Sequence, residues 1–331
     1  MIIDSRAFAR AGLLGNPSDG YFGKTISLSI KNFGAQVLLY QSPELVIEPQ
    51  EADANTFRNI YQLKETVSLI GYNGGIPIIK AAIKKFCDYC DDNSIKLSNK
   101  NFTIRYHSSI PRQVGLAGSS AIIIATLKAL MQFYNVDIAA HLLPNIALAA
   151  ETQEMGINAG LQDRVIQCYE GCVHMDFNKK QMHKHGYGVY TKIDPALLPK
   201  LYVAYKTDLG KVSGKVLNEI RSKYDKGDEH VIGTLNTIAN LADEGMQAIL
   251  NKDYNLLGEL INQNFDNRCK IMTISDSNMA LIQTARGCGA SASFTGSGGA
   301  IIGMYEDDEM LKKLVYSLKK LNARVVKPYI I

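Results

Sequence analysis

The chain has 331 residues, of which 46% are hydrophobic, and its 36 basic and 32 acidic side chains leave a net charge of +4. Domains of ~100–200 residues are usual, so this length predicts two domains with sizeable cores. The basic residues form no long block that would bind nucleic acid, and no run reaches the ~18 apolar residues of a membrane span. We therefore expect a globular protein with neither nucleic-acid nor membrane partners.

The N-terminal segment and the cysteines both favour a cytoplasmic protein. Asp4, Arg6 and Arg10 interrupt the apolar core that a signal peptide requires. Six cysteines are few for this length, which favours a reduced protein over a disulfide framework. Cys87 and Cys90 have CxxC spacing, but no second pair follows at zinc-ligand spacing, so we interpret them as helix residues one turn apart.

The first predicted elements are strands. Residues 25–30 (TISLSI) and 35–40 (AQVLLY) are rich in alternating and β-branched side chains, and with 45–49 (LVIEP) they predict two or three strands paired as a meander. Apolar residues at helical spacing predict a helix over 75–90, and the alternation in 102–111 (FTIRYHSSIP) predicts a strand.

The middle of the chain predicts a helix at 144–155, begun by Pro144, a second helix at 161–169 and a strand at 171–177. The segment 178–192 is polar and contains glycine, which makes it the best candidate for a boundary. We place the two domains at 1–185 and 186–331.

The second domain begins with a predicted strand at 201–207. Helical patterns follow at 213–224, 229–250 and 253–266, and residues 290–305 (ASASFTGSGGAIIGMY) predict a glycine loop between strands. Helices and strands alternate without a regular β-α-β rhythm. The fold class we predict is therefore α+β rather than a doubly wound sheet.

The stretch PRQVGLAGSSAIII at 111–124 lies between a predicted strand and a predicted helix. Gly115 and Gly118 allow positive φ and a close approach of the backbone, and the free N–H groups of a helix start form an anion site. Ser119 and Ser120 add hydroxyls that bind phosphate or magnesium. From this stretch alone a phosphate site and a simple helix cap are equally good interpretations.

Two further glycine-rich loops favour the phosphate site. ARAGLLGNPSDGYFG lies near the N-terminus, and FTGSGGA near the C-terminus contains Gly296, Gly298 and Gly299. Between them lie Glu151 and Asp163, on neighbouring predicted helices. One carboxylate suits a magnesium ion and another suits the deprotonation of a hydroxyl group.

These stretches resemble the motifs of the GHMP kinases, a family that includes galactokinase, homoserine kinase and mevalonate kinase. PRQVGLAGSSA is similar to the second motif, P-x-x-x-G-L-G-S-S-A, GNPSD to the first, FTGSGGA to the third, and GLQDR to the segment with the catalytic aspartate. The resemblance covers nearly the whole chain, and its longer strings are most similar to the glucuronokinase group. It implies a two-lobed fold, with an N-terminal ATP-binding domain and a ferredoxin-like C-terminal lobe.

The resemblance also implies roles for single residues. Asp163 would be the catalytic acid that takes the proton of the sugar hydroxyl, and Arg10 would pair with it and keep it ionised. Asp19 would hold sugar hydroxyls. One departure from the motif is Ala117, where most of the family has glycine, and an alanine fits there if its φ is negative.

The expected nucleotide site follows from the second and third motifs. Ser119 or Ser120, together with Glu151, would hold Mg²⁺. The residues implied to surround the ATP phosphates are Pro111, Gly115, Leu116, Ala117, Gly118, Ser119, Ser120, Gly296, Ser297, Gly298 and Gly299.

The implied reaction is in-line transfer of the γ-phosphoryl group of ATP to the anomeric hydroxyl of D-glucuronate, which gives glucuronate 1-phosphate and ADP and serves UDP-glucuronate salvage. The substrate carboxylate calls for an arginine or a lysine. Arg268 and Arg164 are candidates, as are Arg112 and Lys24, and the sequence leaves the choice open. Tyr21 is a further candidate for contact with the sugar.

Three alternatives are weighed against this hypothesis. A kinase of the same fold would act on galacturonate, arabinose, galactose or a heptose phosphate. A non-catalytic sensor would bind the same ligands, but the joint presence of Ser119, Ser120, Glu151, Asp163 and all three glycine loops favours an enzyme. A NAD-dependent dehydrogenase would need GxGxxG after a strand and then a ribose-binding acid, an order that this chain lacks. The oligomeric state is left open.

Overall fold

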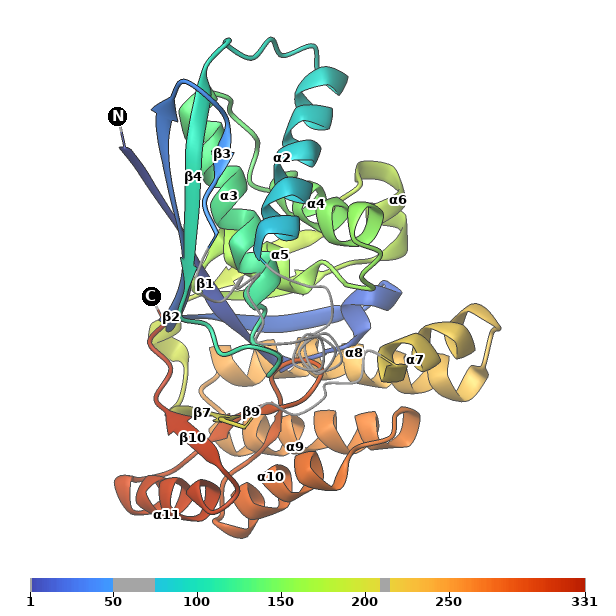
Figure 1. Cartoon of the computed structure of the whole chain (residues 1–331). Coiled ribbons are helices and arrows are strands. Elements are labelled where there is room, and N and C mark those ends of the chain that lie inside the picture. Colours follow the sequence, from blue (N-terminus) through green and yellow to red (C-terminus); the bar gives the residue numbers. More distant parts are fainter. Residues whose placement is uncertain (1, 50–74, 209–214, 331) are drawn as a thin grey trace, which may run out of the picture.

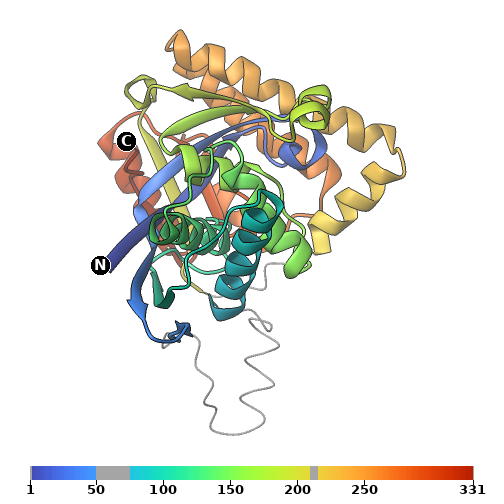
Figure 2. The same ribbon diagram turned by 90° about the horizontal axis from the view of Figure 1, so that it is seen from above.

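The computed structural model of the chain describes residues 2–49, 75–208 and 215–330. The strands in these ranges form a six-stranded sheet in the first part of the chain and a four-stranded sheet in the last part. In Figure 1 the first sheet and its helices lie above the second sheet and its helices. Both termini lie on the same side of the molecule (Figures 1 and 2). The α+β class and the two lobes predicted from the sequence are confirmed.

The first sheet is built on two long antiparallel strands, β1 (Ile2–Leu14) and β2 (Lys24–Ser42). The C-terminal half of β2 pairs with β4 (Asn101–Ser108) and its N-terminal half pairs with β5 (Cys172–Asp176). Two shorter strands complete the sheet at its edges, β3 (Val46–Ile47) beside β4 and β6 (Val189–Ile193) beside β5.

The predicted meander of two or three early strands is wrong. Residues 25–30 and 35–40 belong to the single strand β2, which runs through the polar residues between them because β1 pairs with it on both sides of a bulge at Phe8 and Ala9. The sequence reasoning assigned no strand to β1. Ile3, Ser5 and Ala7 are buried and alternate with the exposed Ile2, Asp4 and Arg6, but an exposed isoleucine and a buried serine weaken the period-two pattern in the sequence.

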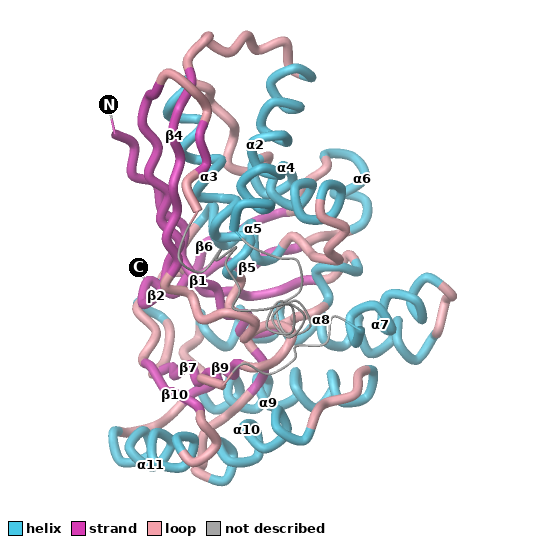
Figure 3. The backbone as a smooth tube through the Cα atoms, in the orientation of Figure 1, coloured by secondary structure: helices cyan, strands magenta, loops and turns pink. Residues whose placement is uncertain are grey.

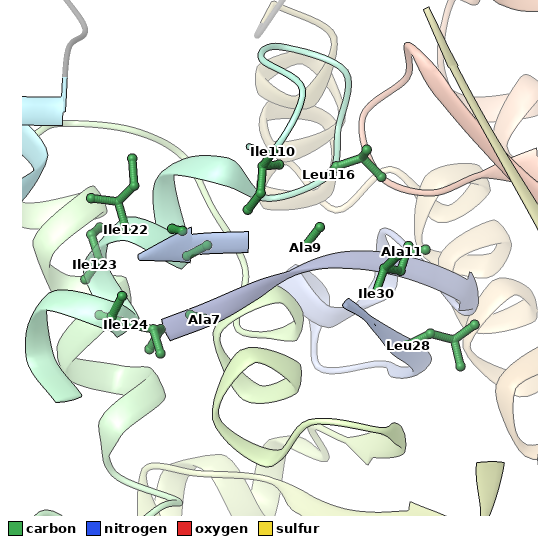
Figure 4. Packing of buried hydrophobic residues seen from close by; sticks show 14 of the residues in the cluster. Ala7, Ala9, Ala11, Leu28, Ile30, Ile110, Leu116, Ile122, Ile123 and Ile124 are labelled. Carbon is green, nitrogen blue, oxygen red and sulfur yellow. The ribbon is translucent and has the colours of Figure 1, made fainter. Parts of the chain in front are cut away.

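Helices cover one face of the first sheet (Figure 3). The central one, α3 (Gly118–Tyr134), packs on β1 and β2, with α2 (Gly75–Asp92), α4 (Leu143–Ala149) and α5 (Gln162–Tyr169) around it. Its residues 122–124 are three isoleucines that are all buried. Figure 4 shows them beside the small side chains of β1, which leave room for the helix. A helix buried on most sides has a continuous apolar run, as SSAIII does.

Most of the predicted middle elements are confirmed. Residues 144–155 form α4 and a π-helical turn, η3 (Ala150–Glu154), and residues 161–169 form α5. The polar segment 178–192 contains α6 (Lys179–His185) and most of β6. The boundary after residue 185 stays a prediction. Since β6 pairs with β5 in the first sheet, the strand pairing favours a division after this strand.

The second sheet has a ferredoxin-like topology. Its strands are β7 (Leu201–Lys206), β8 (Ser293–Phe294), β9 (Ala300–Met304) and β10 (Ala323–Val326), in the spatial order β10-β7-β9-β8 with all neighbours antiparallel. Helices separate β7 from β8 and β9 from β10, which gives the β-α-β-β-α-β order of that fold.

The helices of the second lobe are α7 (Lys215–Asp225), α8 (Glu229–Leu250), α9 (Tyr254–Ile271), α10 (Asp276–Gly287) and α11 (Asp308–Lys319). The first three confirm predicted helices, whereas α10 and α11 were not predicted. Two short 3-10 turns are η1 (Ser18–Tyr21) and η4 (Pro195–Leu197). None of the described helices is long and apolar enough to cross a membrane.

The two lobes share a packed and hydrogen-bonded junction. Helix α8 packs on β2 of the first sheet, as well as on α9. The buried side chain of Asn264, on α9, accepts a hydrogen bond at 2.8 Å from the N–H of Gly15, just after β1. The end of β1, where the first glycine loop begins, is therefore held by the second lobe.

Candidate active site

Two adjoining cavities lie where the lobes meet. The first has a volume of about 300 Å³ and is lined by the turn η1, the segment around α5, and residues of α7 and α9. The second has a volume of about 360 Å³ and is lined mainly by residues 110–119 and α2. Both cavities are lined by Arg10, Ser119, Ile157, Asp163 and Ser297. A group bound in one cavity would therefore meet a group bound in the other beside Asp163.

The loop before α3 forms most of the second cavity. Gly115 has φ 72° and Ala117 has φ 60°, so the chain turns sharply and α3 begins at Gly118 with its first N–H groups free of helical partners. Such a helix start attracts anions through these N–H groups and the helix dipole. The predicted nucleotide-site residues that line this cavity are Pro111, Gly115, Leu116, Ala117, Gly118, Ser119 and, from the third glycine loop, Ser297.

Ala117 does not have the negative φ under which an alanine was expected to fit. It is the N-cap of α3 and lies in the left-handed region. The cause is the turn itself, which must reverse the chain between a buried Leu116 and the helix start. A side chain in this region costs about 1–2 kcal/mol relative to glycine. The loop therefore holds a strained residue beside its anion site.

The two candidate serines differ in their surroundings. Ser119 lines both cavities, and its hydroxyl donates to Oε1 of Glu151 at 2.7 Å. Ser120 is buried, donates its hydroxyl to the carbonyl of Ala117 at 3.2 Å and lines neither cavity. The structure therefore places Ser119 beside Glu151, whereas Ser120 contacts the backbone of its own helix start.

The third glycine loop packs against the second. Gly296 and Ser297 line the first cavity, whereas Gly298 and Gly299 line neither. A Cβ on Gly115 would lie 2.9 Å from the carbonyl oxygen of Gly298, and a Cβ on Gly299 would lie 2.9 Å from Cα of Val114. These glycines are required because two backbones touch there.

Strand β1 joins both loops. The N–H of Arg10 donates to the carbonyl of Leu116 at 3.2 Å, and the N–H of Gly12 donates to that of Thr295 at 2.8 Å. The guanidinium of Arg10 also donates to the carbonyls of Thr295 and Gly115. The buried Arg10 side chain therefore links the loop before α3 to the third glycine loop through hydrogen bonds to both backbones.

Arg10 and Asp163 form the ion pair expected from the sequence. Nη2 of Arg10 lies 2.6 Å from Oδ1 of Asp163, whose side chain is 21% exposed, and Asp163 is in the first turn of α5. The other oxygen, Oδ2, is 3.6 Å from Nη1 of Arg164. One carboxylate oxygen is therefore held tightly by Arg10, while the other makes a longer contact with Arg164.

Glu151 lies in the π-helical turn and is 1% exposed, with Arg164 beside it. Nη2 of Arg164 pairs with Oε2 of Glu151, and its Nη1 donates to the carbonyl of Gly160 at 2.7 Å. Burial, and then Arg10, lower the pKa of Arg164 to about 9, so it stays charged at neutral pH.

Magnesium would fit the oxygen pair of Ser119 and Glu151. Mg²⁺ prefers oxygen ligands at about 2.0–2.1 Å in an octahedron, in which neighbouring ligands lie roughly 3 Å apart. The 2.7 Å between Ser119 Oγ and Glu151 Oε1 is close to that spacing. The described residues hold no group of three or more His, Cys, Asp or Glu side chains that would bind a metal ion. Phosphate oxygens and water would supply the further ligands.

Asp19, in η1, also lines the first cavity and accepts a hydrogen bond from the N–H of Gln162 at 3.2 Å. Gly160 makes room for it, since a Cβ there would lie 2.0 Å from Oδ2 of Asp19. Burial, and then the nearby charge of Asp163, raise the pKa of Asp19 to about 6. The carboxyl group is therefore ionised at neutral pH but titrates only about one unit lower.

The candidate carboxylate-binding residues fall in different places. Arg268, on α9, lines the first cavity, where it donates to the side chain of Asn16 and to the carbonyl of Gly296. Arg164 lines the same cavity and Arg112 lines the second. Lys24 lines neither and instead pairs with Asp243 at 2.5 Å.

Sequence reasoning missed Arg221, which also lines the first cavity. It lies on α7, in a polar helix pattern that carries no motif, so no local signal could have singled it out. Tyr21, a candidate for contact with the sugar, lines the same cavity, with the guanidinium carbon of Arg221 at 4.4 Å from its ring centroid.

The fold and the site define a phosphoryl-transfer enzyme of two lobes, and family comparisons give its class. Residues 77–171 match the family described as "GHMP kinases N terminal domain", and residues 246–323 match "GHMP kinases C terminal". The chain belongs to the GHMP kinase family.

Particular relatives are more informative about the group within that family. The chain is 46% identical to "Glucuronokinase 1" of Arabidopsis thaliana, over 91% of this chain and 84% of that protein. It is 44% identical to "Probable glucuronokinase 2" of the same plant, over 99% and 91%. Among solved structures, Lactococcus lactis galactokinase complexed with galactose superposes with a TM-score of 0.78 at 15% identity, covering 99% of this chain and 93% of that one. That last likeness supports the fold alone.

Proposed function

We propose that this protein is an ATP-dependent kinase that phosphorylates D-glucuronate at its anomeric hydroxyl, with glucuronate 1-phosphate and ADP as products. The identity of 46% to a glucuronokinase supports the substrate. The single observation that best supports the reaction is the Arg10–Asp163 ion pair, at 2.6 Å, placed where a cavity of about 300 Å³ meets one of about 360 Å³.

The proposed arrangement assigns one substrate to each cavity. ATP lies in the second cavity, with its phosphates against the N–H groups at the start of α3, and the sugar lies in the first. Asp19 accepts hydrogen bonds from sugar hydroxyls. Ser119 and Glu151 hold Mg²⁺, which neutralises phosphate charge when it is bound.

The reaction then needs one proton transfer and one exchange of bonds at phosphorus. Asp163 takes the proton of the anomeric hydroxyl, whose oxygen forms a bond to the γ-phosphorus while the bond from that phosphorus to the β-phosphate oxygen breaks. Arg10 holds Asp163 in place through Oδ1. Since such transition states are loose, positioning and charge neutralisation contribute more than strong base catalysis.

The test is an ADP-release assay with glucuronate, galacturonate, arabinose and galactose, combined with phosphorus NMR of the product. We expect the highest kcat/KM with glucuronate and a phosphate on C1. Negligible turnover of glucuronate beside a good rate on a neutral sugar would refute the proposed substrate.

The variant Asp163→Asn tests the role of the base. We expect ATP binding to be kept and kcat to fall by roughly 10²–10⁴-fold, the usual contribution of a positioned general base. Asp137→Asn is a matched control, because Asp137 is exposed and lines neither cavity. An unchanged kcat in Asp163→Asn would remove Asp163 from the mechanism.

A further inference from the structure

The first cavity is lined by an excess of positive charge. Its charged lining residues are four arginines, Arg10, Arg164, Arg221 and Arg268, and three acids, Asp19, Glu151 and Asp163. The ATP phosphates are proposed to lie in the second cavity, so within the first cavity the single negative charge of a sugar acid would balance this excess. The lining therefore favours an anionic occupant, and the arginine that meets it remains to be assigned.

Three of the four arginines already have close partners. Arg10 pairs with Asp163, and Arg164 pairs with Glu151. Arg268 is 1% exposed and donates from Nη1 to Asn16 and from Nη2 to Gly296. Each of the three also has an Nε without a hydrogen-bond partner, but this atom is buried, so a substrate carboxylate would have to compete for the Nη groups, and breaking a buried pair is costly.

Arg221 differs in each of these respects. Its side chain is 41% exposed. Its Nη2 donates to the carbonyl of Gly20 at 2.6 Å, and Nη1 lies 3.9 Å from the exposed carboxylate of Asp225, beyond hydrogen-bonding distance. Among the described residues the structure records no other hydrogen bond from this guanidinium. Donor capacity is therefore left at the cavity.

The guanidinium is also held in position. It lies over the ring of Tyr21 at 4.4 Å, and Tyr224 packs on the same ring at a centroid distance of 4.8 Å. Gly20 leaves space for it, since a Cβ there would be 3.3 Å from Nη2 of Arg221. Cation–π contact and one backbone hydrogen bond orient the group, and its one recorded ion pair, with the exposed Asp225 at 3.9 Å, is long and screened by water.

We propose that Arg221 binds the carboxylate of the sugar acid and so selects a uronate over a neutral hexose. This inference rests on the proposed function. Arg221 lines the first cavity and not the second, whereas Asp163 lines both. The sugar is therefore placed with its C1 hydroxyl toward Asp163 and its C6 carboxylate toward α7; these groups are attached to C1 and C5, the two carbons that flank the ring oxygen.

Kinetic assays that compare two substrates in two proteins test the assignment. Glucuronamide has the shape of glucuronate but no charge, and both are assayed with the unaltered protein and with Arg221→Ala. We expect Arg221→Ala to raise KM for glucuronate roughly 10- to 100-fold, the loss of a charge-assisted hydrogen bond, with kcat and KM for ATP nearly unchanged. KM for glucuronamide should change little, so the preference for the acid should disappear.

The control for charge is Lys223→Ala, which removes a cation from an exposed position on the same helix. It should leave KM for glucuronate unchanged, and Arg221→Lys should restore part of the preference. If Arg221→Ala keeps the full preference for glucuronate, or raises both KM values equally, the assignment is wrong.

The unaltered protein separates this failure from a failure of the proposed function. If it turns over glucuronate and Arg221→Ala does so equally well, only the role of Arg221 is refuted. If it acts on galacturonate instead, the proposed substrate is wrong, and the same assays with galacturonate and its amide decide the role of Arg221. If it acts only on neutral sugars, both are refuted.

Discussion

At the scale of single residues, the ionised carboxylate of Asp19 lowers the stability of the folded protein at neutral pH. Burial, and then Asp163, raise its pKa from 3.8 to about 6. The folded protein thus binds this proton more tightly than the unfolded chain does. By linkage, the stability that this group contributes is complete below pH 3.8 and is lost as the pH rises through about 6. Near neutral pH the protein keeps an ionised carboxylate in a place that disfavours it.

Asp19→Asn should therefore stabilise the protein at neutral pH and have little effect on stability in acid. An asparagine keeps an acceptor for the N–H of Gln162. We expect a gain of roughly 1–2 kcal/mol above pH 6, discounted for the partial exposure of the group, and a gain near zero at pH 4. Urea unfolding at both pH values measures the difference, and an equal gain at both would contradict the assigned pKa. KM for the sugar should rise, because a hydroxyl would lose a charged acceptor.

At the scale of elements, the decisive feature is the contact between the two glycine loops. Gly115 combines φ 72° with a close approach to Gly298, and Arg10 donates to the carbonyl of Gly115 from β1. The start of α3 and the loop before β9 are thereby held together at the point where the phosphates of ATP are proposed to bind. A side chain at Gly115 would force the two backbones apart.

Gly115→Ala should lose more stability than the left-handed conformation alone explains, and KM for ATP should rise. Gly227→Ala is the matched control, since Gly227 has φ 78° and a Cβ added there would meet no atom within 4 Å. We expect the control to lose about 1–2 kcal/mol, the usual cost of a left-handed alanine, without any effect on ATP. If both variants lose the same stability, the loop contact contributes nothing.

At the scale of the whole molecule, residues of both lobes line the two adjoining cavities. The first lobe supplies β1, α3 and α5, and the second supplies α7, α9 and the third glycine loop, so a ligand that fills the site contacts both. Ligand binding should therefore stabilise the molecule as a unit. Linkage makes this increase predictable from the dissociation constant.

Glucuronate at 100 times its dissociation constant should raise the free energy of unfolding by about 2.7 kcal/mol. The measurement is urea unfolding of Asp163→Asn with glucuronate, ADP and Mg²⁺, each added alone and together; ADP carries no γ-phosphoryl group, so the ligands stay unreacted. The same concentration of glucuronate should stabilise a protein that also carries Arg221→Ala much less. No stabilisation by any of these ligands would contradict the proposed site.

Local sequence predicted much of the site and of the helical framework. The boundaries of α8 agree with the predicted helix at 229–250, because its pattern and its N-cap Asp228 are local signals. The three glycine loops were expected from the residues themselves, and the Arg10–Asp163 pair was expected through the family resemblance. Helices α10 and α11 were missed, as was β1, in whose sequence an exposed isoleucine and a buried serine weaken the alternation.

The sequence by itself determined the residues that have a local requirement: glycines where a turn needs positive φ, a helix start with free N–H groups, and acids and serines near it. Only the tertiary structure decided which of them meet. It placed Ser119, and not Ser120, beside Glu151, and it brought Arg221 into hydrogen-bonding contact with Gly20, which lies 201 residues away in the chain. The physical reason is that such contacts depend on how the two lobes pack, which no short stretch of sequence contains.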